Sequence, residues 1–146
     1  QEGTEGGSDR AAIDLMLGID TNILVRFLVR DDESQFEKAR RLIRREIVAG
    51  RRVFVSQLVL LETEWVLRSR YVLQKIEIIA VVSGLLDAND VQFEDEPAVE
   101  EAFFVWKDNA VGFADCLIGA RNKRLGCSAT ATFDVKASRL PGFISA

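Results

Sequence analysis

Four acidic residues stand where an apolar, strand-like stretch of this sequence passes into a polar or helical segment. They are Asp20, Glu62, Asp115 and Asp134. A carboxylate embedded in apolar sequence is costly unless a counter-charge or a metal compensates it. Oxygen ligands suit hard cations such as Mg²⁺ and Mn²⁺, and the chain contains no histidine. We therefore predict that the four acids bind Mg²⁺ or Mn²⁺ as catalytic ligands.

The composition excludes several other kinds of protein. Hydrophobic residues make up 48% of the 146 and charged residues 29%, as in a globular protein with one core. No apolar run approaches the roughly 20 residues of a membrane span. The absence of histidine excludes His-ligated zinc and Ser-His or Cys-His catalysis. Cys116 and Cys127 lie in apolar stretches, so we interpret both as buried side chains in a reducing cytoplasm.

The charges are distributed unevenly along the chain. Residues 21–75 carry twelve basic and seven acidic groups, which give this segment a net charge of +5, although the net charge of the whole chain is −4. Such a block can contact phosphates, or it can be a solvated helix face. The residues in question are Lys38, Arg40, Arg41, Arg44 and Arg45.

The pattern predicts a leader followed by one domain. Residues 1–15 are polar and glycine-rich, which indicates a flexible leader or a remnant of expression. Residues 16–146 then alternate between short apolar runs and helical periodicity, with Ser34 and Glu37 forming a capping box. Strands are expected at 17–20, 53–55, 91–93, 127–132 and 143–145. Helices are expected at 22–29, 34–49, 57–70, 75–87, 97–108 and 113–125.

This alternation predicts an α/β fold, a three-layer α/β/α sandwich with a central, mostly parallel sheet. Ligands of such sheets bind beyond the carboxyl ends of the strands, where Asp20 and Asp134 would lie. Asp115 falls in the first turn of a helix, whose positive dipole end favours an anion. Helical spacing places Glu62 on the predicted buried face and Glu64 on the opposite one.

Carboxylate-bound Mg²⁺ or Mn²⁺ suits phosphodiester hydrolysis, because the cation activates water and neutralises developing charge. Each acid also has an ordinary structural explanation. Asp20 and Asp134 could be turn residues, Asp115 a helix cap and Glu62 one half of an ion pair. All four together are better explained by one site.

Four motifs in register resemble the PIN domain, particularly the VapC-type toxin ribonucleases of bacterial toxin–antitoxin pairs. The resemblance spans about residues 16–145. The motifs are Gly18-Ile19-Asp20-Thr21-Asn22-Ile23-Leu24, Leu60-Leu61-Glu62-Thr63-Glu64-Trp65-Val66-Leu67, Phe113-Ala114-Asp115-Cys116-Leu117 and Thr132-Phe133-Asp134.

The resemblance implies that Asp20, Glu62, Asp115 and Asp134 are the metal-binding quartet, with Asn22 and Thr132 as supporting polar residues. It also implies a cytoplasmic ribonuclease with an RNA substrate, a cognate antitoxin and a homodimeric state. Gly112 stands where many relatives carry a further acid.

Three alternatives remain open from the sequence. A non-catalytic PIN-like domain could bind RNA or assemble with proteins. A phosphoaspartyl phosphatase using Asp20 would need a second Asp where Asn22 stands. A 5′-nuclease on structured DNA would carry more acids and extra DNA-binding elements than this chain has room for.

Overall fold

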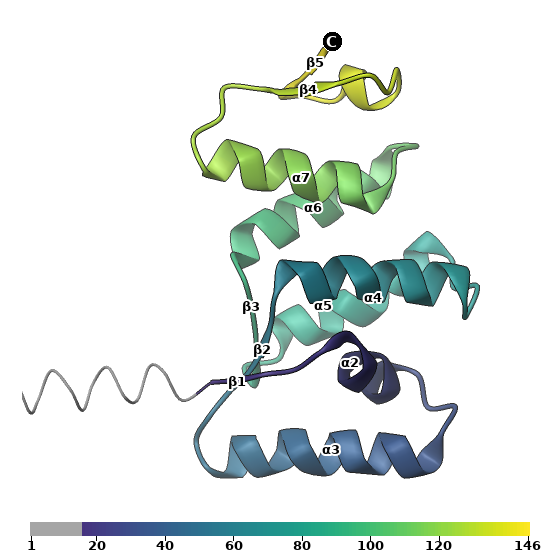
Figure 1. Ribbon diagram of the computed structural model, residues 1–146, viewed down its shortest axis with the longest axis vertical. Coiled ribbons are helices and arrows are strands. Elements are labelled where there is room, and N and C mark those ends of the chain that lie inside the picture. Colours follow the sequence, from purple (N-terminus) through teal and green to yellow (C-terminus); the bar gives the residue numbers. More distant parts are fainter. Residues whose placement is uncertain (1–15) are drawn as a thin grey trace, which may run out of the picture. The chain divides into compact units, whose positions relative to one another are not determined.

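The structure is a computed structural model that describes residues 16–146 (Figure 1). The predicted leader at 1–15 lies outside the described residues. The described chain divides into two compact units, which are described separately. The first holds the described part of Gln1–Thr63 together with Ser83–Glu94, and the second holds Glu64–Val82 and Asp95–Ala146.

The first unit is organised around a three-stranded parallel sheet in the order β1-β2-β3. The strands are β1 (Leu17–Gly18), β2 (Val53–Val55) and β3 (Val91–Phe93). The first and last residues of β2 and β3 are buried. Apolar strands of this kind are typical of parallel sheets, whose faces are both covered.

Helices α2 (Thr21–Leu28) and α3 (Glu33–Val48) follow β1. The expected Ser34–Glu37 capping box is wrong: Asp32 caps α3, and its side chain accepts from the backbone N–H of Gln35 at 3.0 Å. Glu37 instead pairs with Arg40 at 3.0 Å. The predicted stop at Gly50 is confirmed, because this glycine adopts φ +77° directly after the C-cap, as a helix-terminating glycine does.

Two further helices, α4 (Gln57–Ser69) and α5 (Lys75–Asp87), each contribute residues to both units. The apolar residues of α5 are only partly exposed: Ile76 is exposed, whereas Ile78 and Val82 are buried. No described helix has the length and apolar character required to cross a membrane.

The second unit contains α6 (Glu96–Asp108), α7 (Phe113–Arg124), β4 (Thr130–Thr132), the 3₁₀-helix η1 (Ala137–Arg139) and β5 (Phe143–Ser145). Strands β4 and β5 form a parallel pair. The Phe143 ring lies so close to Gly119 of α7 that an added Cβ would stand 2.5 Å from it. A larger residue at Gly119 would therefore require the Phe143 ring to move.

The predicted α/β fold with parallel strands is confirmed, and every described ladder is parallel. The strands form two sheets, β1-β2-β3 and β4-β5. Strands β2, β3 and β5 agree with the prediction residue for residue, as does helix α5. Strands β1 and β4 are shorter than predicted, because Asp20 already caps α2 and the chain after the turn at Leu125 and Gly126 pairs only from Thr130 onward.

Candidate active site

Asp20 lies between the end of β1 and the start of α2. Its backbone is extended, with φ −88° and ψ 177°, and its Oδ1 accepts a hydrogen bond from the N–H of Ile23 at 3.0 Å. Asp20 is thus the N-cap of α2, where the helix leaves backbone N–H groups without partners. The side chain is exposed, so a fixed backbone presents this carboxylate to solvent. Asn22 is exposed within the first turn of the same helix.

Glu62 lies on α4 and is connected to the residue that follows Asp20. The Thr21 hydroxyl donates to Glu62 Oε1 at 3.0 Å, although 41 residues separate the two in sequence. This hydrogen bond holds one carboxylate oxygen and keeps Glu62 at the start of α2. The first unit therefore brings Asp20 and Glu62 to the same place, beyond the carboxyl end of β1.

The predicted orientation of α4 is wrong. Glu62 is exposed, whereas Glu64 is 4% exposed and forms an ion pair with Arg68 at 2.8 Å. The buried face follows the helical spacing of Leu60, Thr63, Glu64 and Leu67. Glu64 is tolerated there because an arginine one turn later neutralises it. Exposure makes Glu62 more accessible to a ligand than the predicted core position would.

Asp115 lies in the first turn of α7, three residues after the N-cap Gly112. Phe113 begins the helix and is 1% exposed. Its ring stacks on Phe103 at 4.8 Å between centroids and packs against Trp106 at 5.2 Å. This aromatic cluster fixes the start of α7, and with it the half-buried Asp115.

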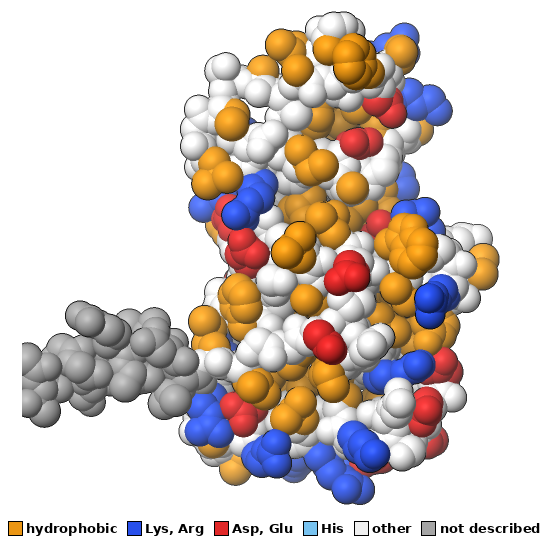
Figure 2. Space-filling model, viewed as in Figure 1, with side chains coloured by type: hydrophobic (Ala, Val, Ile, Leu, Met, Phe, Trp, Pro, Cys, Tyr) orange, Lys and Arg blue, Asp and Glu red, His pale blue; other side chains and the backbone are white. Residues whose placement is uncertain are grey.

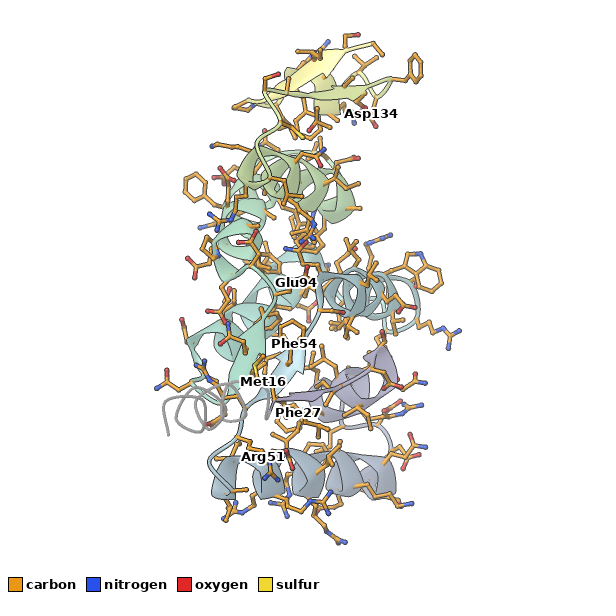
Figure 3. All side chains as sticks on the ribbon, turned by 60° about the vertical axis from the view of Figure 1, so that its left-hand side comes forward. Met16, Phe27, Arg51, Phe54, Glu94 and Asp134 are labelled. Carbon is orange, nitrogen blue, oxygen red and sulfur yellow. The ribbon has the colours of Figure 1, made fainter. Side chains whose placement is uncertain are left out.

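Asp134 follows β4 on an exposed turn, labelled in Figure 3. Its N–H donates to Thr132 Oγ1 at 3.0 Å, and its Oδ1 accepts from the N–H of Ala137 at 3.0 Å. Thr132 thus orients the Asp134 backbone directly, as a supporting residue would. The Asn122 side chain donates to Thr130 Oγ1 at 3.0 Å and connects α7 to β4.

The first unit therefore holds Asp20 and Glu62, which are connected through Thr21, and the second unit holds Asp115 and Asp134. Across residues 16–146, no three His, Cys, Asp or Glu side chains are gathered as a metal site. Binding by all four together stays a prediction. The Asp20–Glu62 pair still fits Mg²⁺ or Mn²⁺ chemically, because Mg²⁺ is commonly held by one or two carboxylates plus substrate phosphates.

The sequence pattern assigned no role to Thr21 or Glu94, which both belong to the first unit. Thr21 supplies the hydroxyl that holds Glu62, and its place directly after Asp20 was the available signal. Glu94, labelled in Figure 3, follows β3, and its Oε1 accepts from the N–H of Gln57 at 2.9 Å. Glu94 thus lies at the end of a parallel strand but caps α4.

The two cysteines differ in their exposure to solvent. Cys116 is buried, as predicted, whereas Cys127 is exposed, which corrects the interpretation of both as core residues. Burial, and secondarily the Asp115 carboxylate, raise the pKa of the Cys116 thiol to about 11. Cys116 therefore stays protonated at neutral pH and serves as packing, because only a thiolate acts as nucleophile or metal ligand.

Comparison with known proteins gives matches along most of the chain. The family model for the PIN domain matches residues 18–142. A VapC ribonuclease from Aquifex aeolicus (strain VF5) is 25% identical over 122 residues, covering 84% of this chain and 90% of that protein.

Two crystal structures also align with the chain. One is VapBC2 from Rickettsia felis bound to a DNA fragment from their promoter, with 17% identity, TM-score 0.36, and coverage of 90% of this chain and 98% of that one. The other is VapC20 from Mycobacterium tuberculosis, a Sarcin-Ricin loop cleaving toxin, with 20% identity and TM-score 0.38. This alignment covers 84% of this chain and 92% of the VapC20 chain.

Proposed function

Because this chain belongs to the PIN domain family, we propose that it is a metal-dependent ribonuclease and the toxin of a toxin–antitoxin pair. One observation carries the proposal: the family match spans 18–142 and so contains all four predicted acids. The alignment with a VapC ribonuclease over 90% of that protein supports the same activity. The pairing of Asp20 and Glu62 through Thr21 adds a local site of suitable chemistry.

The catalytic residues of this proposal are Asp20, Glu62, Asp115 and Asp134, which would hold Mg²⁺ or Mn²⁺. A bound cation of this kind activates water and neutralises charge on the phosphoryl oxygens. The chain's own contribution is positioning. The α2 cap fixes Asp20, the Thr21 hydroxyl holds Glu62, and Thr132 sets the turn of Asp134.

Helix α3 offers a surface for RNA phosphates. Four of its basic side chains are exposed and make no ion pair with any described residue: Lys38, Arg41, Arg44 and Arg45. Figure 2 shows Lys and Arg side chains gathered at the bottom of the view, where α3 lies in Figure 1. Arg40, in contrast, is paired with Glu37. Unpaired cations can neutralise phosphates and release counterions.

Neutralising Arg44 and Arg45 together to glutamine should reduce the salt dependence of RNA binding. The slope of log K against log salt should fall by about 0.7 for each phosphate of single-stranded RNA that the variant no longer neutralises. Fluorescence anisotropy at several salt concentrations measures this slope. Arg40→Gln is the matched control, because its guanidinium is already paired. An unchanged slope in the double variant would mean that this face is merely solvated.

The proposal includes the remaining partners of such a toxin. A cognate antitoxin protein would inhibit it, and two copies would form a homodimer. Its target RNA would be encountered in the cytoplasm. The partly exposed apolar surface of α5, including Ile76 at 74% exposure, favours association of some kind.

Metal dependence can be tested through stability. Adding Mg²⁺ or Mn²⁺ should raise the melting temperature, because a ligand that binds only the folded state stabilises it, by about 2.7 kcal/mol at 100 times Kd. Differential scanning fluorimetry with and without chelator measures the shift. Asp20→Asn and Glu62→Gln should each diminish it. The same metal shift in the wild type and both variants would contradict the assignment of these ligands.

The alternative is a non-catalytic PIN-like domain that binds RNA or assembles with proteins. An assay of total RNA cleavage with and without chelator distinguishes the two hypotheses. Cleavage that requires Mg²⁺ or Mn²⁺ and stops with chelator would support the ribonuclease. RNA binding without cleavage at any metal concentration would favour the alternative.

A further inference from the structure

Lys75, the first residue of α5, holds the end of another helix of the second unit. Its ammonium group donates to the carbonyls of Trp106 and Asn109, each at 2.9 Å. Trp106 lies in the last turn of α6, and Asn109 is the C-cap of that helix. The last carbonyls of a helix have no partners within it, and the helix dipole favours a cation there. Lys75 therefore caps α6 from a separate helix, 31 residues before Trp106 in the sequence.

The charge of Lys75 is used in this contact. The side chain is half-buried and makes no ion pair with any described residue. Its Nζ lies 5.5 Å from the centre of the Trp106 ring, a distance at which an aromatic face attracts a cation. Lys107 stands in the same last turn of α6, but it is exposed and makes no hydrogen bond within 16–146. The two lysines at this helix end thus differ in whether they contact its carbonyls.

The connection between α6 and α7, residues 109–112, begins at a carbonyl that Lys75 holds. It ends at Gly112, the N-cap of α7, which supplies no capping side chain. Asp115 Oδ2 lies 3.8 Å from the point where a Cβ on Gly112 would stand, so the carboxylate lies against the end of this connection. Because α7 has no side-chain cap of its own, other residues must fix its first turn.

Asp115 differs from the other three acids in how its carboxylate is held. Asp20, Glu62 and Asp134 each accept a hydrogen bond through a carboxylate oxygen. The carboxylate of Asp115 accepts none from the described part of the chain. Its position therefore depends on where the backbone of the first turn of α7 lies.

We propose that Lys75 is a positioning residue for Asp115. By holding the carbonyls of Trp106 and Asn109, it fixes the connection 109–112, and this connection fixes the turn that presents the Asp115 carboxylate. The inference rests on the proposed ribonuclease function, in which Asp115 is a metal ligand. A ligand displaced by about 1 Å can cost on the order of 10²-fold in rate, so a lysine that acts only through the backbone can still control the reaction.

The test compares three lysine variants of the full chain. Lys75→Met keeps the length of the side chain and removes its donors, whereas Lys75→Arg keeps a charged donor. Lys107→Met is the matched control, because it removes an exposed charge from the same helix end. The values of kcat and KM for cleavage of a labelled RNA are measured at a temperature where circular dichroism shows each protein to be folded.

Lys75→Met should lower kcat about 10- to 100-fold, the usual effect of losing a residue that orients a metal ligand. KM for RNA should not change, and the Mg²⁺ concentration that gives half the maximal rate should rise. Lys75→Arg should recover most of the rate, and Lys107→Met should match the wild type. A Lys75→Met protein with a lower melting temperature but unchanged kcat would overturn the proposal, because the lysine would then serve stability alone.

Hydrogen exchange followed by mass spectrometry tests the same link without activity. Peptides covering 109–117 should exchange faster in Lys75→Met than in the wild type, because local opening of this segment becomes easier. Peptides covering 53–62, in the first unit, should exchange at the wild-type rate. Unchanged exchange at 109–117, or equal acceleration in both segments, would overturn the proposal.

These outcomes remain distinct from the proposed activity. A wild type that cleaves RNA, alongside a Lys75→Met variant with unchanged kcat, would keep the ribonuclease and reject the positioning role. A wild type that cleaves no RNA with Mg²⁺ or Mn²⁺ would reject the ribonuclease, and the exchange comparison would still decide whether Lys75 fixes the first turn of α7.

Discussion

Replacing Asp20 by asparagine should reduce metal-dependent RNA cleavage by a factor on the order of 10²–10⁴, the usual effect of removing one catalytic group. Asn keeps an oxygen ligand but removes the negative charge that attracts the cation. The fold should survive, because Asn caps a helix as well as Asp does and can still accept from the N–H of Ile23. Cleavage of total RNA by each protein, with circular dichroism of both, measures the effect.

Two glutamates of α4 extend this experiment, Glu62 as a second proposed ligand and Glu64 as the control. Glu62→Gln can still accept from the Thr21 hydroxyl, so it should remain folded and lose activity as Asp20→Asn does. Glu64→Gln removes the charge of a buried carboxylate that pairs with the exposed Arg68, so it should lower stability and leave the activity of each folded molecule unchanged. Full activity in folded Asp20→Asn would reject Asp20 as a catalytic metal ligand.

Replacing Phe113 by alanine should destabilise the protein by about 3–5 kcal/mol, the cost of a large cavity at a buried aromatic. The ring is 1% exposed and contacts both Phe103 and Trp106. Such a loss is a large part of the free energy of unfolding, which is roughly 5–15 kcal/mol for a typical native protein. Activity should fall too, because Asp115 lies two residues further along the same helix turn. Urea unfolding followed by tryptophan fluorescence measures the loss.

The control for this variant is Phe104→Ala, which removes the same side chain from an exposed position of α6. Surface substitutions of this kind usually change stability by less than about 0.5 kcal/mol. Phe113→Leu should keep most of the stability, because it fills most of the cavity. Equal losses at Phe113 and Phe104 would show that the cluster does not stabilise the start of α7.

The sequence predicted the helices that carry Glu62 and Asp115, because helix boundaries leave strong local signals. It failed on α4, where apolar residues occur on every side of the helix: Leu58, Val59, Leu60, Leu61, Trp65, Val66 and Leu67. A helix of that kind has no polar face to define its orientation. The usable signal was charge, because Arg68 lies one turn after Glu64 and can neutralise it, whereas Glu62 has no such partner.

Two smaller errors have similar causes. Asp32 and Ser34 are both good caps, and only the backbone geometry decides that Asp32 begins α3. Cys127 follows Gly126, which turns the chain at φ +99°, so an apolar neighbourhood in sequence did not mean burial. The hydrogen bond from Thr21 to Glu62 joins residues 41 positions apart. No local pattern could have predicted this bond, which depends on where α2 and α4 meet.

The turn that positions Asp134 depends on residues that are translated after it. The turn leaves β4, which is held by β5: the N–H of Thr130 donates to the carbonyl of Gly142 at 2.8 Å, and the N–H of Ala146 donates to that of Thr132 at 2.9 Å. During synthesis, Asp20 and Glu62 emerge from the ribosome long before this strand exists. The turn of Asp134 can be set only once β5 has been translated and has left the exit tunnel. A growing chain therefore carries Asp20 and Glu62 before the turn that presents Asp134 can form.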